Sequence, residues 1–260
     1  MKNIFLLSGI AITLLSTSCQ QVIDIELNDK DAAIVIEGNI TDQPGPYTVL
    51  ISKTVNFSDP NTFPGVSGAF VVMYDNVGNI DTLTETSAGT YVTSSIQGVP
   101  GRTYTLAVTS EGKTYTAQSS MPQAITLDSL VLVQSGGFGG SPYYVIPQWQ
   151  DPLGTGNYYR NIEYVNGERV GAFLYDDAFA DGLVNGQPLL NFTTVLEPGD
   201  SVRVEFSCID AAAYLYFYSM EQTANNNTAA PANPESNFDN DALGYFNAHT
   251  FSEKTVVIPQ

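Results

Sequence analysis

The sequence predicts a mainly β protein made of two β-sandwich domains, the first of them immunoglobulin-like, with one short helix in the second. Short segments rich in β-branched and aromatic residues recur at close spacing and are separated by Gly, Pro, Asn and Asp. Hydrophobic residues make up 43% of the chain and charged residues only 14%, which is typical of a folded protein. A length of 260 residues is enough for one or two domains with their own cores.

The chain begins like a bacterial lipoprotein precursor. Lys2 precedes an apolar run over residues 4–15, which is too short to span a bilayer as a helix and is typical of a signal peptide. Small residues precede Cys19, so we expect cleavage of residues 1–18 and acylation of Cys19, for example with palmitate. Residues 19–31 would then form a tether. The alternative is an ordinary secretory signal, with Cys19 as an incidental residue.

The first sandwich is expected over residues 32–122. Turn residues there separate seven segments of strand-like pattern, and this number is typical of an immunoglobulin-like sandwich. Met121 and Pro122 break the pattern and predict the domain boundary. The expected strands cover residues 34–36, 47–53, 69–74, 81–84, 90–93, 103–109 and 113–117.

The second domain, also sandwich-like, is expected over residues 123–260. Apolar side chains alternate along residues 201–208, which places Cys208 in a core, where a free thiol behaves as a small hydrophobe. If Cys19 is acylated, Cys208 has no disulfide partner. The expected strands cover residues 128–133, 143–149, 158–165, 170–175, 189–195, 201–208 and 255–258.

One helix is expected, over residues 211–224. Asp210 can cap its N-terminus, and Ala213, Phe217, Met220 and Ala224 form an apolar stripe at helical spacing. The segment that follows is rich in Asn and Pro, which predicts an irregular loop up to residue 240.

Charge and composition exclude several classes of function. The chain has 27 Asp and Glu against 9 Lys and Arg, a net charge of −18, so it would repel phosphate backbones and we expect no nucleic-acid partner. A single His and two Cys leave almost no ligands for a zinc site or a His-based catalytic centre. We therefore expect no cofactor and no metal centre.

Four segments occur in an order that resembles a known family. Together with the cysteine-containing signal, they resemble the Bacteroidota lipoproteins known as domain of unknown function 4249. The resemblance implies an outer-membrane or cell-surface lipoprotein, often encoded beside a TonB-dependent receptor, and it supplies no catalytic or binding residues. The segments are VIEGNITDQPGPY (35–47), GVPGRTY (98–104), PGD (198–200) and ALGYF (242–246).

The densest acidic clusters are Asp176 and Asp177 with Asp181, and Asp239 with Asp241. Hard cations such as Ca²⁺ prefer several oxygen ligands from one loop, so each cluster is a candidate for calcium. Neither cluster has the spacing of an EF-hand loop. We interpret both as solvated loop carboxylates, with calcium binding as the alternative.

No spacing indicates a catalytic centre. Paired carboxylates can serve a glycosidase, and Glu163 or Glu168 are candidates, but no spacing singles out a pair. His249 lacks the Gly-x-Ser-x-Gly motif that a serine triad of the hydrolase type requires. We interpret His249 as a surface or half-buried histidine and expect no enzymatic activity.

Aromatic residues flank the glycine-rich stretch over residues 136–140. Phe138, Tyr143, Tyr144 and Trp149 can stack on sugars or peptides if they lie on loops, whereas packing in the core or along strand edges is the more ordinary role. We favour packing.

Three short patterns are similar to the Asp-Ser/Thr-apolar acceptor of Bacteroidota O-glycosylation. They place candidate glycans on Thr82, Ser129 and Ser201. Such patterns arise easily in β-rich chains, so the prediction is that at least one of the three carries sugar.

These observations predict a non-enzymatic, lipid-anchored lipoprotein of the outer membrane, at its periplasmic face or at the cell surface. The first hypothesis is a binding or accessory protein beside a TonB-dependent receptor, with residues 136–144 and 225–240 as the expected contact loops. The alternative is a structural or adhesive, fimbrial-like surface protein. The ligand is not indicated by any motif.

Overall fold

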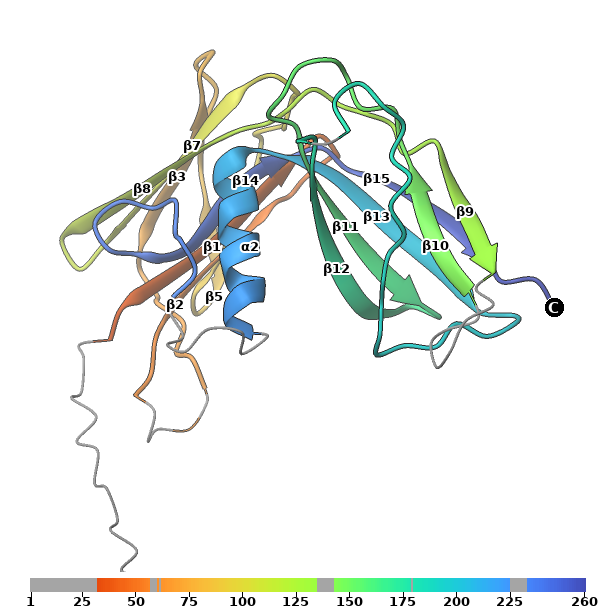
Figure 1. The fold of residues 1–260 in the computed structure, drawn as a ribbon. Coiled ribbons are helices and arrows are strands. Elements are labelled where there is room, and N and C mark those ends of the chain that lie inside the picture. Colours follow the sequence, from red (N-terminus) through yellow and green to blue (C-terminus); the bar gives the residue numbers. More distant parts are fainter. Residues whose placement is uncertain (1–31, 57–59, 61, 135–142, 179, 225–232) are drawn as a thin grey trace, which may run out of the picture. The chain divides into compact units, whose positions relative to one another are not determined.

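The computed structural model describes residues 32–56, 60, 62–134, 143–178, 180–224 and 233–260 (Figure 1). The expected signal peptide, the tether and Cys19 lie outside the described residues, as do the glycine-rich stretch with Phe138 and residues 225–232, the first half of the expected 225–240 loop. Residues Ala32–Gln260 form one compact unit. The chain is mainly β, as predicted, with several sheets and one described helix.

Two sheets form the first sandwich. One has the strand order β14-β1-β2-β6-β5 and the other has the order β4-β3-β7-β8. Buried side chains of both sheets make one shared core, with Ile36, Val49, Met73 and Leu106 fully buried within it. The strands are β1 (Ile34–Thr41), β2 (Thr48–Lys53), β3 (Phe70–Asp75), β4 (Ile80–Thr82), β5 (Thr84–Ser87), β6 (Thr90–Val92), β7 (Thr103–Ser110), β8 (Lys113–Ser120) and β14 (Leu243–His249).

Two features favour an immunoglobulin-like interpretation of this sandwich. Strands β1 to β8 follow the order A-B-E-D in one sheet and C′-C-F-G in the other. Tyr104 near the start of β7 donates its hydroxyl to the Gln97 carbonyl (3.3 Å) and accepts the Val99 N–H (2.7 Å), which is the tyrosine-corner arrangement. The inter-sheet disulfide of antibody domains is absent from the described residues.

The strand expected over residues 81–84 is in fact two strands in different sheets. β4 pairs with β3, whereas β5 pairs with β6. The chain crosses between the two sheets at Leu83, whose side chain is buried and whose N–H donates to the Val71 carbonyl (2.9 Å). In the sequence pattern, a buried residue at the crossing looks the same as a buried residue within one strand. The pattern therefore does not reveal the crossing.

The C-terminal part of the chain completes the first sandwich. β14 pairs in parallel with β1, with Gly244 opposite Ile36. Before β14, Asp239 and Asn240 bond along the β8 edge: the Asp239 N–H donates to the Thr116 carbonyl (3.0 Å), and Asn240 Nδ2 donates to the Thr114 carbonyl (2.8 Å). Part of the sequence expected in the second domain, residues 123–260, therefore belongs to the first sandwich, because it supplies the strand β14.

The second group of sheets lies between β8 and the C-terminus. A hairpin of two strands faces a sheet of order β12-β11-β13-β15, and Val145 from the hairpin shares a core with Val202 and Val204 from the sheet. Cys208 is buried, as predicted. The strands are β9 (Ser129–Gln134), β10 (Tyr143–Gln148), β11 (Tyr158–Val165), β12 (Glu168–Asp176), β13 (Ser201–Ile209) and β15 (Ser252–Val257).

The strand expected over residues 189–195 is absent, and the segment is irregular. The Asn191 side chain accepts the N–H groups of Thr193 (3.0 Å) and Thr194 (3.2 Å), which turns the chain locally. Phe192 is 85% exposed, although it stands in the middle of an apparently alternating pattern. A local side-chain to backbone turn overrode the β propensity of this segment.

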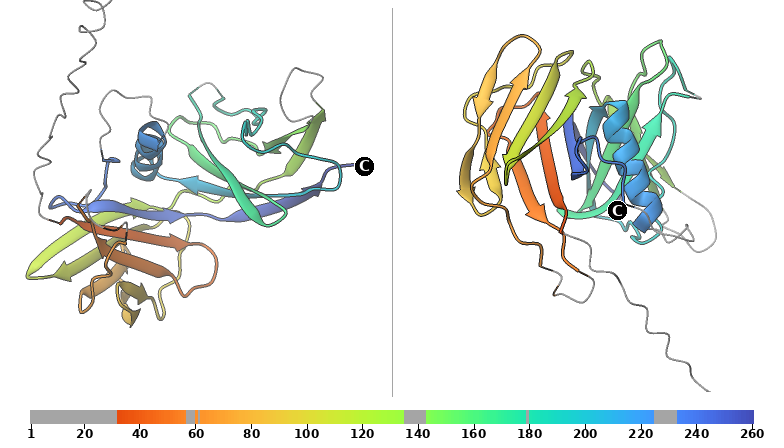
Figure 2. Two further views of the ribbon diagram at one scale, coloured as in Figure 1. Left: turned by 90° about the horizontal axis from the view of Figure 1, so that it is seen from below. Right: turned by 90° about the vertical axis from the view of Figure 1, so that its left-hand side faces the viewer.

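Helix α2 (Ala211–Ala224) has the bounds that the sequence predicts. Asp210 caps it, because its Oδ1 accepts the Ala213 N–H at 2.9 Å. Ala213 and Phe217 of the expected stripe are buried, and α2 packs beside β14 and β11 (Figures 1 and 2). Within the described residues, no helix has both the length and the apolar character needed to cross a membrane.

Candidate ligand-binding cleft and acidic cluster

A cleft opens where the connection between β8 and β9 passes the start of β11. Its volume is ≈ 500 Å³, which lies in the size range of small-molecule sites. Pro122, Ala124, Ile125 and Pro152 supply apolar walls, and residues 208–211, at the end of β13 and the start of α2, also line the cleft. Gln123, Asn157 and Tyr158 add polar groups. The cleft therefore combines apolar walls with a few polar groups, as small-molecule sites generally do.

Two buried ionisable groups of the cleft, Cys208 and Tyr159, have raised pKa values, and the Asp210 carboxylate is hydrogen-bonded. Burial raises the pKa of the Cys208 thiol, so the nucleophilic thiolate is disfavoured. Burial, followed by the hydrogen bond to Asp151, raises the pKa of Tyr159. Both oxygens of Asp210 accept hydrogen bonds from Ala213, Ser119 and Ser120. The lining thus offers binding groups rather than a nucleophile with its base.

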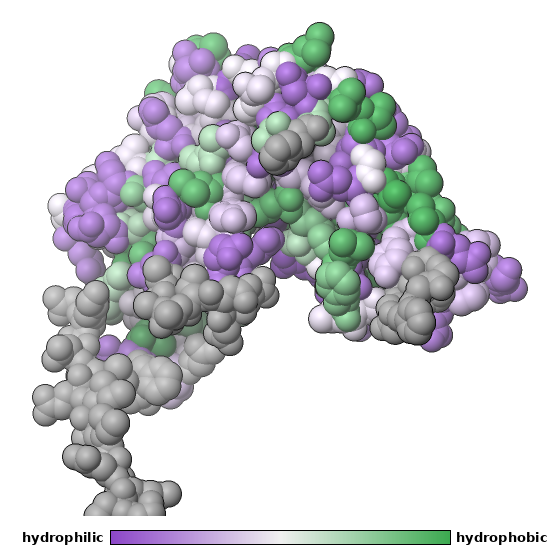
Figure 3. All heavy atoms as spheres, in the orientation of Figure 1, coloured by the Kyte–Doolittle hydropathy of each residue, from purple (hydrophilic) through white to green (hydrophobic). Residues whose placement is uncertain are grey.

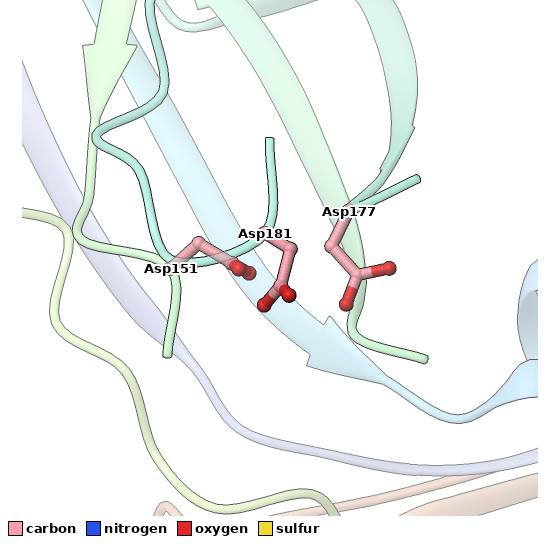
Figure 4. A group of neighbouring side chains, drawn as sticks. All are labelled: Asp151, Asp177 and Asp181. Atoms are coloured by element: carbon pink, nitrogen blue, oxygen red, sulfur yellow. The ribbon is translucent and has the colours of Figure 1, made fainter. Parts of the chain in front are cut away.

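An acidic cluster lies beside this cleft, formed by Asp151, Asp177 and Asp181 (Figure 4). Asp151 follows β10, and the other two belong to the loop after β12. One oxygen from each carboxylate lies within 4.8 Å of the others. Asp151 and Asp177 are buried and Asp181 is exposed. Two chain segments that are separate in sequence therefore bring three negative charges together.

Backbone donors hold these carboxylates in place. Asp177 accepts the N–H groups of Gly156 (3.1 Å) and Asn157 (2.9 Å), while Asp181 accepts that of Gly154 at 2.7 Å. Burial opposes ionisation of Asp177, but the bonds from Asn157 and Gly156 outweigh it and lower its pKa. Asp151 accepts the Tyr159 hydroxyl and, at 2.9 Å, the Gly182 N–H.

The cluster and the cleft share residues. Asn157 lines the cleft while its Nδ2 donates to Asp177 (3.1 Å), and Tyr159 lines the cleft while its hydroxyl binds Asp151. Among the described residues, no Lys or Arg forms an ion pair with the three carboxylates. Three carboxylates are a donor set that suits a hard cation. Only Asp181 is solvated as expected, whereas Asp151 and Asp177 are buried. All three accept hydrogen bonds from the protein, so we favour internally bonded carboxylates over a cation site.

Part of this cluster is predictable from the sequence. The sequence groups Asp177 and Asp181 correctly. The Asp176 carboxylate is not part of the cluster, and its Oδ2 accepts the Tyr214 hydroxyl (3.3 Å). Asp151 is not predicted, because a single Asp directly after an expected strand looks like an ordinary turn residue. In the other predicted cluster, Asp239 Oδ1 accepts the Thr116 N–H at 2.7 Å. The role of Asp239 is therefore to hold the β8 edge.

The other candidates for chemistry are dispersed. Glu163 is buried on β11 and Glu168 is exposed on β12, and burial raises the pKa of Glu163. Asn191 donates to Glu163 Oε2 at 3.3 Å. His249 is half-buried, as expected, and desolvation by the surrounding chain lowers its pKa to about 4. The described contacts do not join these groups into one site.

The aromatic and glycan candidates are all placed, except Phe138. Trp149 is buried against Tyr159 and Phe206, with ring centroids 5.0 and 4.8 Å away, so the packing interpretation is confirmed for it. Tyr143 and Tyr144 are half-buried on β10. Thr82 is exposed on β4. The other two glycan candidates, Ser129 and Ser201, are half-buried at the starts of β9 and β13.

Comparison with known proteins gives a family but no activity. No curated protein matches the sequence. The family model described as Domain of unknown function (DUF4249) matches residues 20–255, nearly the whole chain beyond the expected signal peptide. The sandwich, the cleft and the acidic cluster all lie within this range. On this match, the chain belongs to the family described as Domain of unknown function (DUF4249).

Proposed function

We propose that this protein is a non-enzymatic, lipid-anchored binding protein of the outer membrane that acts beside a TonB-dependent receptor. The observation that carries the binding role is the cleft of ≈ 500 Å³. It offers apolar walls and amide and hydroxyl groups, while the Cys208 thiol has a raised pKa and both Asp210 oxygens are engaged. Such a lining supports recognition of a ligand better than turnover.

The location and the partner rest on the sequence. The start of the chain resembles a lipoprotein signal that ends at Cys19. Acyl chains on this cysteine would hold an otherwise water-soluble body at the membrane. The resemblance to the family implies a TonB-dependent receptor nearby, and the net charge of −18 favours a partner whose contact surface is basic.

The edge strands of the first sandwich are short or partly covered, which favours this role over the adhesive, fimbrial-like alternative. Polymerisation by strand exchange requires a free sheet edge. β14 is the edge strand beside β1, and side chains partly cover it: Asn237 bonds the backbone N–H and carbonyl of Phe246, and Ser119 accepts the Ala248 N–H. Residues 237–240 bond along the edge of β8. The two remaining edge strands, β4 and β5, have only 3 and 4 residues. Short edge strands pair poorly with another chain.

The anchor is tested with Cys19→Ala, using Cys208→Ala as the matched control. We expect Cys19→Ala to move the protein from the membrane fraction to the soluble periplasm, whereas Cys208→Ala stays in the membrane fraction. Mass spectrometry of the wild-type N-terminus should show an acylated Cys19. An unmodified N-terminus that begins downstream of Cys19 would overturn the lipoprotein proposal.

The partner is tested by crosslinking in native membranes, followed by mild-detergent purification. We expect a TonB-dependent receptor to be recovered with this protein in stoichiometric amount, and the yield to fall with added salt. Recovery of only further copies of this protein would favour the adhesive alternative instead.

The cleft is tested by native mass spectrometry of protein purified from its host. We expect a noncovalent adduct on the wild type. Ala124 is exposed and lines the cleft, so Ala124→Trp should fill the space and remove the adduct. Ala178, exposed in the loop after β12, provides the control substitution Ala178→Trp, which should keep the adduct. Retention of the adduct in Ala124→Trp would place the ligand elsewhere.

A further inference from the structure

The outer face of the sheet β4-β3-β7-β8 carries no charged side chain, although the whole chain has a net charge of −18. The pairing register places every second residue of these described strands on this face. β3 contributes Phe70, Val72 and Tyr74, and β4 contributes Ile80 and Thr82. β7 and β8 contribute residues 103, 105, 107, 109, 114, 116, 118 and 120, which are all threonine except Ala107, Gln118 and Ser120.

The acidic residues of these strands are turned to the interior instead. Asp75 is buried and forms an ion pair with Arg102 at 2.9 Å. Asp81 is buried and accepts the N–H groups of Ser94, Ser95 and Ile96. The outer face is therefore uncharged because both carboxylates of these strands form an ion pair or hydrogen bonds on the inner side.

One side of this face is apolar and exposed. Phe70 is 60% exposed, Tyr74 38% and Ile80 68%. Tyr74 and Ile80 are directly opposite each other in the β3–β4 register, and Val72 lies between Phe70 and Tyr74 on the same strand. These four residues, called here the β3 patch, form one continuous apolar surface. Aromatic enrichment and depletion of charge are the compositional marks of the centre of a protein interface.

We propose that the β3 patch is the docking surface for a protein partner whose contact surface has an apolar centre and a basic periphery. This inference rests on the proposed function, since the partner is the TonB-dependent receptor proposed above. The uncharged face allows close contact without desolvating a carboxylate, which is costly. The acidic residues elsewhere on the chain attract a basic periphery around that contact.

The same charges disfavour two other occupants. A second copy of this chain would bring another net charge of −18 to the contact, so repulsion opposes self-association. Attachment of a sheet face to an anionic lipid surface relies on Lys and Arg near the headgroups. The only Lys or Arg in these four described strands is Lys113, whose Nζ donates to the Asn240 carbonyl at 2.7 Å.

The test places a photo-crosslinking p-benzoylphenylalanine at position 70 of the full chain in its native host. Position 192 is the matched control, because Phe192 is also an exposed phenylalanine but lies outside the first sandwich, between β12 and β13. Hydrophobic residues are exposed on that part of the molecule as well (Figure 3). Irradiation of native membranes should join the receptor to position 70 and not to position 192. The adducts are identified by mass spectrometry.

A second pair of variants measures binding rather than proximity. Ile80→Glu places a carboxylate in the β3 patch, and we expect at least about a tenfold loss of receptor recovered in the pull-down. Leu153→Glu makes the same kind of change at an exposed residue between β10 and β11, outside the first sandwich, and should leave receptor recovery unchanged. Equal thermal melts of both variants would show that neither change disturbs the fold.

The outcomes separate this inference from the proposed function. If the receptor is recovered but crosslinks only from position 192, the β3 patch is the wrong surface while the proposed function stands. If position 70 joins a second copy of this chain, or if a glycan on Thr82 is found to cover the face, the inference is overturned. If no receptor is recovered with the wild type at all, the proposed function fails together with it.

Discussion

Asp210 and Ser119 are 91 residues apart in the chain, and the Ser119 hydroxyl donates to Asp210 Oδ2 at 2.7 Å. The same oxygen accepts the Ser120 N–H (2.9 Å), while Oδ1 caps α2 through Ala213. Ser119 Oγ in turn accepts the Ala248 N–H at 2.9 Å. One carboxylate therefore joins β8 of the first sandwich to the start of the helix, and through Ser119 to β14.

Replacement of Asp210 by Ala should be strongly destabilising. It removes the helix cap, worth about 1 kcal/mol, and two further hydrogen bonds to a carboxylate. We expect the free energy of unfolding to fall by about 2–4 kcal/mol, measured by urea denaturation followed by circular dichroism. Asp128→Ala is the control at an exposed Asp, and it should cost less than about 0.5 kcal/mol. Similar losses in the two variants would contradict the role given to Asp210.

Asp81 should make stability depend on pH in the acid range. Burial opposes its ionisation, but hydrogen bonds from Ser95, Ile96 and Ser94 outweigh this and lower its pKa from 3.8 to about 2. A carboxyl group whose pKa is lowered on folding stabilises the protein above its unfolded pKa, and this stabilisation is lost as the pH falls through the folded pKa.

The measurement compares unfolding of the wild type and Asp81→Asn from pH 7 to pH 2. At pH 7 the variant should be less stable by about 2 kcal/mol. The difference should shrink between about pH 4 and pH 2, as the wild-type carboxyl group becomes protonated. A difference that stays constant over this range would show that loss of the hydrogen-bond geometry, and not the charge, is responsible.

Gly244 fits where no side chain can. Its φ is +97°, and a Cβ atom at this position would lie 2.0 Å from the Ile36 carbonyl oxygen across the β1–β14 pair. Gly244→Ala should therefore force the parallel strands apart and lower the free energy of unfolding by at least about 3 kcal/mol. Hydrogen exchange should show loss of protection in β1.

Gly186→Ala provides the matched control for this change, because a Cβ atom there meets open space. We expect its unfolding curve and its exchange pattern to equal those of the wild type. If Gly244→Ala also behaves like the wild type, β14 does not pair with β1 as described.

The charge of Asp181 should destabilise the native protein when no cation is bound to the cluster. It lies within 4.8 Å of two other acidic groups, and no Lys or Arg of the described residues pairs with them. Asp181→Asn keeps an oxygen for the Gly154 N–H and removes one charge. We expect it to raise stability by about 0.5 kcal/mol in the presence of a chelator, seen as a higher Tm.

Two further measurements examine the same cluster. Asp177→Asn should lower stability, because Asp177 has a lowered pKa and both of its oxygens accept hydrogen bonds. If Asp181→Asn is instead less stable than the wild type in millimolar calcium, the cluster binds a cation and our interpretation as internally bonded carboxylates is wrong.

The local structure and the family of this protein are both predictable from its sequence. Most strands, the bounds of α2, its Asp210 cap and the burial of Cys208 follow from the periods of hydrophobic residues and from capping chemistry, which are properties of neighbouring residues. The family followed from short segments spread along the chain, and the match over residues 20–255 confirms it.

Which distant segments meet is not predictable in this way and became apparent from the three-dimensional structure. The parallel pairing of β14 with β1, the crossing at Leu83 and the approach of Asp151 to Asp177 all depend on contacts between residues far apart in the chain. Hydrophobic periodicity states that a residue is buried but not which strand covers it, because any apolar surface satisfies the same free-energy requirement. The irregular segment around Asn191 shows the reverse case, in which a few specific hydrogen bonds displaced a strand that the pattern favoured.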